Sequence, residues 1–425
     1  MSKKILLITS TFLPEQNPRA FRWGSLSKSF MEFGYTVDVF TQKHKDIIRE
    51  TEANGIRYCE TDGYLFHKFI NRHILSKAEG VIIPGEKRNY SKTSAIIKKF
   101  LASFAKIFIW PDISGLWFLS SRKKIKELLA GNNYDCIISS CPGFASHLIG
   151  YYAKMKSNNI KWIGEYGDPY SFSPIQSKSI FSFINKPAEA IIIKKMDYIV
   201  VPIEKSKVGF LKHFPFINEQ KIKVIPQSFK SIKPDAGNID WGYFDHKLVN
   251  IVYTGTLYPN IRNPNILLES LLLLKQSNIE KYKKLRLHFF GRYDNVESIF
   301  KKYQELLDDK SVILYGGVLR ENCSFACQKA DFLLNISNIS DYQTPSKLIE
   351  YLAYKKPIIS LENKTSAGLN WPFLLKVDYK TKTMVKFFKD ILNNKFAVPF
   401  YDYNDIIKNY DIGKIRDQYI NLILS

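Results

Sequence analysis

The stretch with the clearest chemistry is residues 343–357, which reads QTPSKLIEYLAYKKP. A helix that begins at Pro345 or Ser346 after a buried strand would direct free backbone N–H groups and its dipole at an anion. Proline suits such a first turn, because its missing N–H would have had no partner there. Lys347 adds a full positive charge, and Glu350, one turn on, can accept hydrogen bonds from adjacent hydroxyls. A diphosphate joined to a ribose presents this combination of groups.

A second loop of the same kind follows residues 249–254, VNIVYT, as Gly255-Thr256-Leu257, with Arg262 soon after. Glycine allows the backbone to approach a phosphate closely, and arginine offers two parallel hydrogen bonds to it. One glycine after a strand is weak evidence of a phosphate site. Two such loops in one half of the chain, each with a cation, indicate a diphosphate site more strongly.

Four side chains in the first half of the chain are candidates for contact with a second substrate. Asp168 lies in Gly-Asp-Pro after residues 161–164, where a carboxylate could orient or deprotonate a hydroxyl, although aspartate before proline also favours a simple turn. His147, near the start of a helix, is the other candidate, with a helix-turn histidine as the alternative. Arg19 and Arg22 follow the first strand and could hold a diphosphate, or could form surface ion pairs.

The elements that must position these residues alternate between strands and helices, which is typical of parallel α/β layers. Short β-rich runs in the first half are residues 4–9, 36–41, 135–140, 161–164, 197–202 and 221–226, with helical spacing at 21–33 and 144–156. In the second half the predicted strands are 249–254, 285–290, 312–315, 332–336 and 357–361, and the predicted helices are 265–274, 297–307, 321–329 and 346–354. The pattern predicts two Rossmann-like domains.

The pattern also predicts where the domains begin and end. Residues 229–247 lose periodicity and collect Pro, Gly, Asp and Asn, as a linker does. We therefore expect an N-terminal domain at 1–228, a linker at 229–247, a C-terminal domain with the diphosphate site at 248–402, and a helix at 403–425 that crosses back onto the first domain. Ligands of open α/β sheets bind at the carboxyl ends of the strands, so a cleft between two such domains would hold the substrates.

The composition is that of a globular protein with a large positive charge. The chain has 425 residues, 45% of them hydrophobic, and 62 Lys and Arg against 40 Asp and Glu give a net charge of +22. Extended disorder is excluded by this composition. Five cysteines without CxxC spacing indicate reduced thiols, and Cys323 and Cys327 lack the second ligand pair of a metal site. The sequence contains no uninterrupted run of 18 apolar residues, so no transmembrane helix is predicted.

The excess charge fits an anionic membrane, an anionic substrate or nucleic acid, or it is a generic solvated surface. Residues 94–126 combine an apolar helix face, Trp110 and Trp117, and the basic run at residues 122–126. An interfacial helix needs such a composition. The alternative is an ordinary amphipathic helix packed on its own domain. A nucleic-acid-binding protein is a further alternative, motivated by 25 Tyr and 30 Phe beside the charge, but no recognition module occurs, so no nucleic-acid partner is expected.

Several of these segments together resemble a known family. YTGTL at residues 253–257, VILYGGVLREN at 312–322 with residues 328–331, and PSKLIEYLAYKKPII at 345–359 look like the donor half of a GT-B glycosyltransferase of the retaining family 4 type. TSTFLPEQNPRAFRWGSLSKSFMEFGYTVDVFT is similar to that family's opening strand, acceptor-side loop and second strand. SSCPGFASHLIGYY followed by KWIGEYGDPYS resembles its fourth and fifth strand ends. The resemblance covers about residue 3 to 425 and implies two Rossmann-like domains that face each other across a cleft.

The resemblance also implies roles for individual residues. Glu350 corresponds to the second acid of the family's E-x7-E pattern, which binds the nucleotide ribose, and Arg262 to its phosphate-binding lysine. Thr256 stands where many members have arginine, and Tyr342 stands in place of the first acid. The resemblance therefore says least about the contacts to the donor sugar. Lys347 is the cation that could replace the missing arginine. Members often have histidine near Asp168, while a subgroup has aspartate followed by proline, which this chain matches.

The implied reaction is transfer of a sugar, with retention at the anomeric carbon, from a UDP- or GDP-linked donor. The fixed cations would take the place of a metal ion, so no cofactor is expected. The implied acceptor is a saccharide on a polyprenyl diphosphate, in capsule, O-antigen or exopolysaccharide synthesis, with the enzyme cytoplasmic and peripheral at the inner face of an anionic cell membrane. A nucleotide-sugar 2-epimerase of GT-B fold is the alternative within the enzymes.

Overall fold

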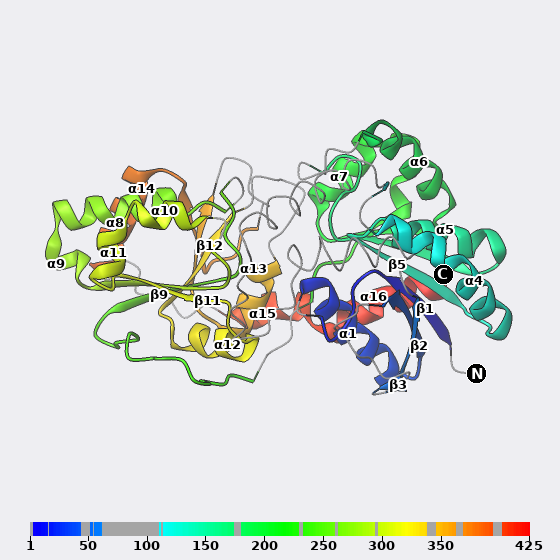
Figure 1. Ribbon diagram of the computed structural model, residues 1–425, viewed down its shortest axis with the longest axis horizontal. Helices are drawn as coiled ribbons and strands as arrows, with labels where there is room; N and C mark the ends of the chain where they lie inside the picture. The colour runs from blue at the N-terminus through cyan, green and yellow to red at the C-terminus, as the bar shows by residue number, and fades with distance from the viewer. Residues whose placement is uncertain are drawn as a thin grey trace, which may run out of the picture. The chain divides into compact units, whose positions relative to one another are not determined.

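The computed structural model of the chain contains two compact α/β units, which are coloured along the chain in Figure 1. The first unit comprises Met1–Gln227 and Ile412–Ser425, and the second comprises Ser228–Asp411. The structure describes residues 3–15, 17–43, 52–53, 55–61, 110–111, 114–173, 180–228, 233–259, 262–293, 296–337, 346–362, 369–393 and 402–425. Each unit is considered by itself.

The first unit is built on one largely parallel sheet. Within the described residues the sheet has the order β3-β4-β2-β1-β5-β6-β7-β8, and only β3 and β4 pair antiparallel. The strands are β1 Lys4–Thr9, β2 Thr36–Gln42, β3 Glu52–Ala53, β4 Ile56–Thr61, β5 Cys136–Cys141, β6 Lys161–Tyr166, β7 Tyr198–Val201 and β8 Ile222–Val224. The continuous apolar runs that predicted most of them are explained by burial on both faces.

Helices cover the two faces of this sheet. The helices are α1 Pro18–Glu32, α4 Gly115–Gly131, α5 Ala145–Lys156, α6 Asn185–Lys195, α7 Glu204–His213 and α16 Ile412–Leu424, with 3-10 turns η2 Ser182–Ile184 and η3 Glu219–Lys221. Along β1, Leu6 and Ile8 join one apolar cluster with α4 and α5, while Ile5 and Leu7 join another with α1 and α16. Alternate side chains of a strand point to opposite faces, so β1 lies at the centre of two cores.

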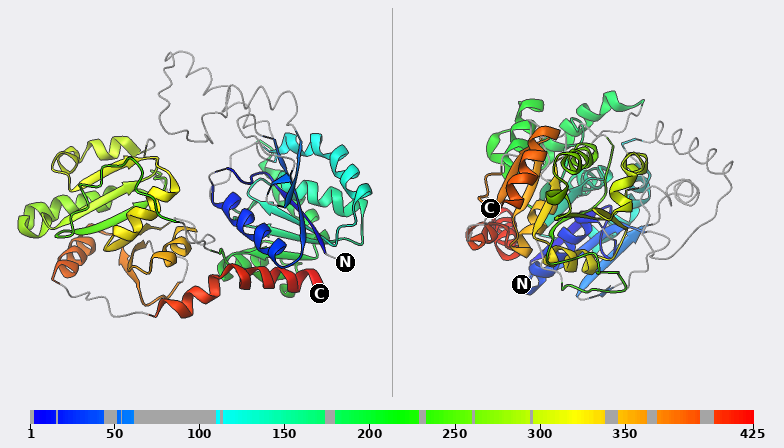
Figure 2. Two further views of the ribbon diagram at one scale, coloured as in Figure 1. Left: turned by 90° about the horizontal axis from the view of Figure 1, so that it is seen from below. Right: turned by 90° about the vertical axis from the view of Figure 1, so that its left-hand side faces the viewer.

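The last helix of the chain completes the first unit. Tyr419 of α16 packs edge-on against Trp23 and Phe30 of α1, with ring centres 5.6 Å and 6.3 Å away, and Figure 2 (left) shows α16 in red along the first unit. The sequence places the change of unit at residue 403, whereas the structure places it between Asp411 and Ile412. The reason is that Tyr403, at the start of α15 Tyr403–Ile407, is buried in the second unit, 4.2 Å from the ring of Phe373.

The second unit has an entirely parallel sheet. Within the described residues its order is β11-β10-β9-β12-β13-β14. The strands are β9 Val249–Thr254, β10 Leu285–Phe290, β11 Val312–Gly316, β12 Phe332–Ile336, β13 Ile358–Glu362 and β14 Leu374–Asp378. The helices are α8 Asn265–Ser277, α9 Ile279–Tyr282, α10 Glu297–Lys301, α11 Gln304–Asp308, α12 Arg320–Lys329, α13 Ser346–Tyr351, α14 Thr381–Leu392 and α15, with 3-10 turns η5 Leu352–Tyr354 and η6 Lys408–Tyr410. Figure 1 shows α8, α10 and α14 on one face of the sheet and α12 on the other.

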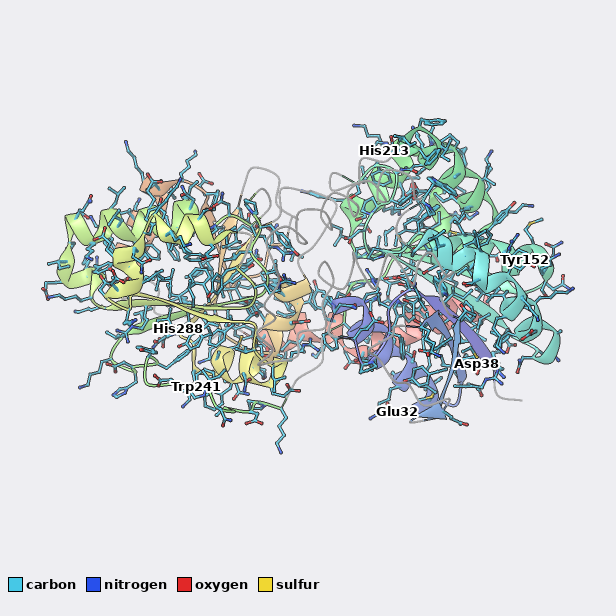
Figure 3. The ribbon with its side chains drawn as sticks, viewed as in Figure 1. Glu32, Asp38, Tyr152, His213, Trp241 and His288 are labelled. Atoms are coloured by element: carbon cyan, nitrogen blue, oxygen red, sulfur yellow. The ribbon has the colours of Figure 1, made fainter. Side chains whose placement is uncertain are left out.

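Two segments of the second unit differ from the sequence prediction. The single helix predicted at 297–307 is two short helices, because the backbone of Tyr303 leaves the helical region and its hydroxyl donates to Asn265 at 3.1 Å. The segment predicted as a linker packs on the second unit. Its Trp241, labelled in Figure 3, lies 4.6 Å from the Phe325 ring, and Phe244 stacks on His288 at 3.8 Å.

The segment predicted as interfacial is in part an ordinary core helix. Residues 94–109 lie outside the described residues. In α4, the Trp117 ring is buried and stacks on Phe40 with 5.6 Å between ring centres, and its Nε1 donates to Thr61 Oγ1 at 2.9 Å. Trp110 Nε1 donates to Asn185 Oδ1 at 2.8 Å. Both indoles are therefore engaged within the first unit. The helix α4 has the packing of the alternative interpretation, an amphipathic helix packed on its own domain.

Candidate functional site

Three glycines line the carboxyl edge of the second sheet, where open α/β sheets bind ligands. Gly255, Gly291 and Gly316 follow or end β9, β10 and β11 with φ values of +125°, +122° and +73°, which L side chains rarely adopt. The Gly255 N–H donates to the carbonyl of Phe290 at 2.5 Å, and the Gly291 N–H donates to that of Gly316 at 2.7 Å. A Cβ at Gly291 would lie 2.4 Å from the carbonyl oxygen of Gly255. At Gly255 and Gly291 the backbone is therefore packed too closely for a side chain, whereas the space beside Gly316 is open.

The amine of Lys347 lies against this edge. Lys347 is in the first turn of α13, and its Nζ is 4.3 Å from the centre of the Tyr253 ring and in contact range of Gly255. The Nζ atom is buried and has no hydrogen-bond partner in the described part of the chain. Burial, helped by the charge of Arg262 and opposed by that of Glu350, lowers the pKa of Lys347 well below its ordinary value. An anion that binds here would supply the missing partner.

Arg262 belongs to the same site. Its backbone pairs with Tyr258 through N–H donors at 3.0 Å and 3.3 Å, which closes the loop after β9. Burial raises the pKa of Tyr253 to about 12, and the nearby Arg262 guanidinium opposes that rise. Arg262 therefore acts electrostatically on both Tyr253 and Lys347. The structure brings the two predicted cations together around one buried tyrosine.

Glu350 lies one turn beyond Lys347 and is paired with a residue that the sequence did not single out. Its Oε1 accepts a hydrogen bond from Arg320 Nη2 at 2.7 Å, and both side chains are partly exposed. Arg320 is the first residue of α12, in the VLREN part of the family-like segment. Thirty residues of chain separate the pair, so only the location of Arg320 in that segment could have indicated it.

The remaining predicted donor residues contribute less to the described geometry. Thr256 is half-buried, and its backbone carbonyl accepts the Tyr253 hydroxyl at 3.1 Å. Ser346 is the first residue of α13. Tyr342 lies outside the described residues.

In the first unit, a buried carboxylate organises the predicted arginines. Glu165 at the end of β6 accepts from Arg19 Nη1 at 2.5 Å and from Ser140 at 2.7 Å, and Arg22 Nε is 3.3 Å away. Burial alone would lower the pKa of Arg19, but Glu165 and Asp168 raise it overall. Asp168 is half-exposed beside this cluster. Arg19 and Asp168 therefore form one charged group at the carboxyl end of β6.

Arg22 and His147 are buried, which differs from the predicted contact with an acceptor. The Arg22 side chain is 3% exposed, and its guanidinium donates to the carbonyl of Pro226 at 2.7 Å and to the Tyr419 hydroxyl at 3.2 Å. His147 is fully buried with Nδ1 2.8 Å from Ser139 Oγ, and burial together with Arg19 lowers its pKa to about 3. Both side chains have structural roles, since neither reaches solvent.

A further titratable group lies beneath the Asp168 loop. Glu189 of α6 is fully buried, and its Oε2 accepts the backbone N–H of Ser171 at 3.0 Å. Burial raises its pKa from 4.5 to about 7, and the Ser171 hydrogen bond opposes the rise. This group could not be predicted from the sequence, because a glutamate among lysines on a helix is usually solvated.

The described residues contain neither a cluster of metal ligands nor a disulfide. In that part of the chain, no three His, Cys, Asp or Glu side chains gather as a metal site would require, and none of the five cysteines is disulfide-bonded. Across the same ranges, no helix combines the length and apolarity needed to cross a bilayer.

Comparison with known proteins matches this chain to sugar-transferring enzymes. Residues 249–373 match the family described as "Glycosyl transferases group 1". No curated protein matches the chain in sequence. Among solved structures, HepE of Anabaena in complex with UDP and glucose is 11% identical with a TM-score of 0.63, covering 99% of this chain and 98% of its own. Sucrose-phosphate synthase of Thermosynechococcus elongatus is 14% identical, with a TM-score of 0.59 and coverage of 99% and 96%.

A third similar structure is the lipopolysaccharide outer core galactosyltransferase WaaB in its apo form, 15% identical over 99% of both chains with a TM-score of 0.56. At these identities the likeness establishes the fold, two Rossmann-like units of GT-B type, along the whole chain. The three glycines, Lys347, Arg262 and Glu350 all lie within residues 249–373, the segment that matches the family. The chain therefore has the GT-B fold, and residues 249–373 of its second unit match the glycosyl transferases group 1 family.

Proposed function

We propose that the second unit binds a nucleotide-diphosphate sugar, with the diphosphate at the glycine edge between Lys347 and Arg262 and the ribose hydroxyls at Glu350. The observation that carries this proposal is the Lys347 amine, buried against Gly255 and Tyr253 without a hydrogen-bond partner in the described residues. A buried cation without a partner costs stability, and a diphosphate would offset that cost. Gly255, Thr256 and Ser346 contribute backbone around it.

The donor base that we propose first is uracil, with guanine as the alternative. HepE of Anabaena was solved with UDP and glucose, and a similar Escherichia coli trehalose-6-phosphate structure was solved with UDP-2-fluoro glucose. Both have the same fold, which supports UDP as the first ligand to test. Tyr342 remains a proposed donor contact from the family resemblance.

The chemistry that these residues favour is departure of the diphosphate. The bond between the anomeric carbon and the phosphate oxygen breaks, and its electron pair stays on the diphosphate, where negative charge accumulates. Lys347 and Arg262 would stabilise that charge in a site shielded from water, which is where fixed cations are most effective. We propose that this replaces a metal ion and that the new bond forms with retention, as in the retaining family that the chain resembles.

The acceptor side is proposed for the first unit. Asp168 would orient the attacking hydroxyl or take its proton, and Arg19 would hold an acceptor phosphate or Asp168 itself, since the two share one charged cluster. We propose a saccharide on a polyprenyl diphosphate as acceptor, in cell-surface polysaccharide synthesis, with the enzyme in the cytoplasm at an anionic membrane. The likeness to WaaB, a lipopolysaccharide galactosyltransferase, supports this class.

Nucleotide binding tests the donor site directly. UDP, GDP, ADP and CMP are each added to the protein, and the melting temperature and heat of binding are measured. We expect a diphosphate nucleotide to raise the melting temperature of the natural sequence and Lys347→Met to lose at least tenfold in affinity. Lys329→Met, an exposed lysine of α12 in the same unit, is the matched control. Unchanged affinity in Lys347→Met would overturn the proposal.

Product analysis separates the proposed reaction from its alternatives. Incubation of a UDP-sugar without acceptor should yield no new sugar isomer, whereas an epimerase would produce one. Micromolar binding to duplex DNA of arbitrary sequence, with an affinity that falls steeply as salt is added, would favour the nucleic-acid alternative. The glycosyl transferases group 1 match favours transfer over both.

A further inference from the structure

An unusual number of large apolar side chains are exposed along one segment of the first unit. Phe183 of η2 is 75% exposed, Ile191 of α6 is 56% exposed, and Val208 of α7 is 61% exposed. Ile180 before η2 and Phe216 after α7 are about half exposed as well. We call this the α6–α7 surface, defined by Ile180, Phe183, Ile191, Val208 and Phe216. Exposed apolar side chains that gather on one surface mark an interaction site.

The helical spacing explains why these side chains lie outside the core. Phe183, Pro187 and Ile191 follow one another at intervals of four residues, so they form a stripe along η2 and α6. On the opposite side of α6, Ile192 and Ile193 are buried in the core of the first unit. The helix therefore satisfies the core with one face and presents a second apolar face to solvent.

The same surface is strongly basic. Lys186, Lys194, Lys195 and Lys212 are exposed on α6 and α7. The exposed acidic residues of α6, α7 and η3 are Glu204 and Glu219, and Glu219 pairs with Lys207 at 2.8 Å. Lys194 Nζ lies 4.9 Å from the centre of the Phe216 ring, which connects the end of α6 to the turn after α7. Burial, with Lys186 and Lys212 nearby, lowers the pKa of His213, labelled in Figure 3 at the end of α7. The lysines and apolar side chains are thus interleaved.

We propose that the α6–α7 surface binds the anionic surface of a lipid bilayer. Aromatic and aliphatic side chains insert at the boundary between headgroups and acyl chains, while lysines around them attract anionic headgroups. A second copy of this chain fits the surface poorly, because each copy carries a net charge of +22 and would bring lysines against lysines. This inference rests on the membrane location proposed above and deepens it by naming the surface that binds. Because lipid binding uses no residue of the donor site, the two proposals can fail separately.

Vesicle co-sedimentation tests the proposal on the full-length protein. Vesicles of phosphatidylglycerol mixed with phosphatidylcholine are compared with vesicles of phosphatidylcholine alone. We expect the protein to pellet with the anionic vesicles and to dissociate as sodium chloride is raised, since surface charge attraction is screened within a Debye length. Equal binding to both vesicle types, or no binding to either, would overturn the proposal.

Two variants divide the apolar from the electrostatic contribution. Phe183→Ser with Ile191→Ser should lower the partition coefficient at least tenfold, because two side chains no longer leave water. Lys186→Gln with Lys194→Gln should lower it by about fivefold per lysine, which corresponds to about 1 kcal/mol each. The matched control is Leu273→Ser with Ile279→Ser, exposed apolar positions of the second unit, which should bind vesicles as the natural sequence does.

The variants are also examined for folding, nucleotide affinity and oligomeric state. All are surface substitutions, so we expect unchanged melting temperatures and unchanged UDP affinity. This separates a failure of the lipid proposal from a failure of the donor-site proposal. If Phe183→Ser with Ile191→Ser leaves vesicle binding intact but converts a dimer to a monomer in sedimentation velocity, the surface is a self-association interface and the lipid proposal is wrong.

Discussion

The amine of Lys347 occupies the space that any side chain at position 255 would need, since a Cβ built on Gly255 would lie 1.6 Å from Nζ. Gly255 also has a φ of +125°, so glycine is required here both by the backbone conformation and by the space that Nζ fills. The glycine of the loop and the lysine of α13, 92 positions apart in the chain, are therefore packed as one structural unit, which lies in the proposed donor site.

Gly255→Ala should consequently destabilise the protein and displace the lysine. We expect a loss of about 1–3 kcal/mol in the free energy of unfolding, from backbone strain and the clash with Nζ, and a loss of nucleotide affinity. Urea denaturation and calorimetry measure the two effects. Gly131→Ala, at the end of α4 with open space around it, is the control and should be neutral or slightly stabilising.

Lys347→Met should stabilise the nucleotide-free protein while it impairs nucleotide binding. Methionine keeps the apolar stem and can contact the Tyr253 ring, but it removes a buried amine that lacks a hydrogen-bond partner among the described residues. The free energy of unfolding should rise by about 1–3 kcal/mol at neutral pH. Destabilisation by this variant would show that the amine has a structural partner and would contradict its assignment to a ligand.

The affinity for UDP should fall as the pH rises through the lowered pKa of Lys347. Because the pKa of Lys347 is lowered by burial and by Arg262, its amine loses its proton below the ordinary value of 10.5, and a bound diphosphate would raise that pKa again. Binding is thus strongest below the pKa of the free protein and weakens as pH passes through it. Calorimetry from pH 7 upward, above the phosphate pKa of about 6, measures how the UDP affinity changes with pH. In Lys347→Arg, whose side chain stays charged, the affinity should no longer change with pH over this range.

Glu189 should make the stability of the protein fall between about pH 4.5 and about pH 7. Its pKa is about 7 in the folded protein and 4.5 ordinarily, so in this window the folded state retains a proton that the unfolded state releases. At about 1.4 kcal/mol per pH unit the total loss is about 3 kcal/mol. The free energy of unfolding, measured by urea denaturation at several pH values across this range, should fall less steeply with pH for Glu189→Gln than for the natural sequence. The exposed Glu204→Gln should match the natural sequence.

Arg22→Met should loosen the attachment of α16. The variant removes the hydrogen bonds to Pro226 and Tyr419 and leaves Glu165 with one arginine fewer. Removing one partner of a buried ion pair costs about 3–5 kcal/mol. Tyr419→Phe removes a single hydrogen bond and should cost about 1 kcal/mol. Hydrogen exchange of the α16 amides should increase in the first variant, whereas a change confined to acceptor kinetics would contradict a structural role.

The strands could be predicted from the sequence because most of them are continuous apolar runs buried on both faces. Those from β9 to β12 begin and end within a residue of the prediction. Three strands of the described residues were not predicted. β3 has only two residues, and β4 and β14 mix charged residues into the run, as in IRYCET and LLKVD. The break between α10 and α11 has no glycine or proline to signal it and depends on the tertiary contact of Tyr303.

The closeness of Lys347 and Arg262, the cations of the proposed donor site, could be predicted because their loops have local signatures. Glycine follows β9, and a lysine lies in the first turn after a proline. The partner of Glu350 could not, since Arg320 comes from another helix. The burial of Arg22 and His147 could not be predicted either. Which arginine of α1 faces solvent depends on Glu165 and Tyr419, and both come from distant parts of the chain.

The position of α16 has a consequence for how the protein is made. Ile415, Tyr419 and Ile423 belong to the same apolar cluster as Ile5 and Val37, so one face of the first sheet is covered only when the final turns of the chain are present. During synthesis the ribosome delivers the entire second unit before that face can close. The emerging polypeptide would therefore carry an uncovered apolar surface through most of its translation, and truncation before α16 would leave that surface exposed to chaperones and proteases.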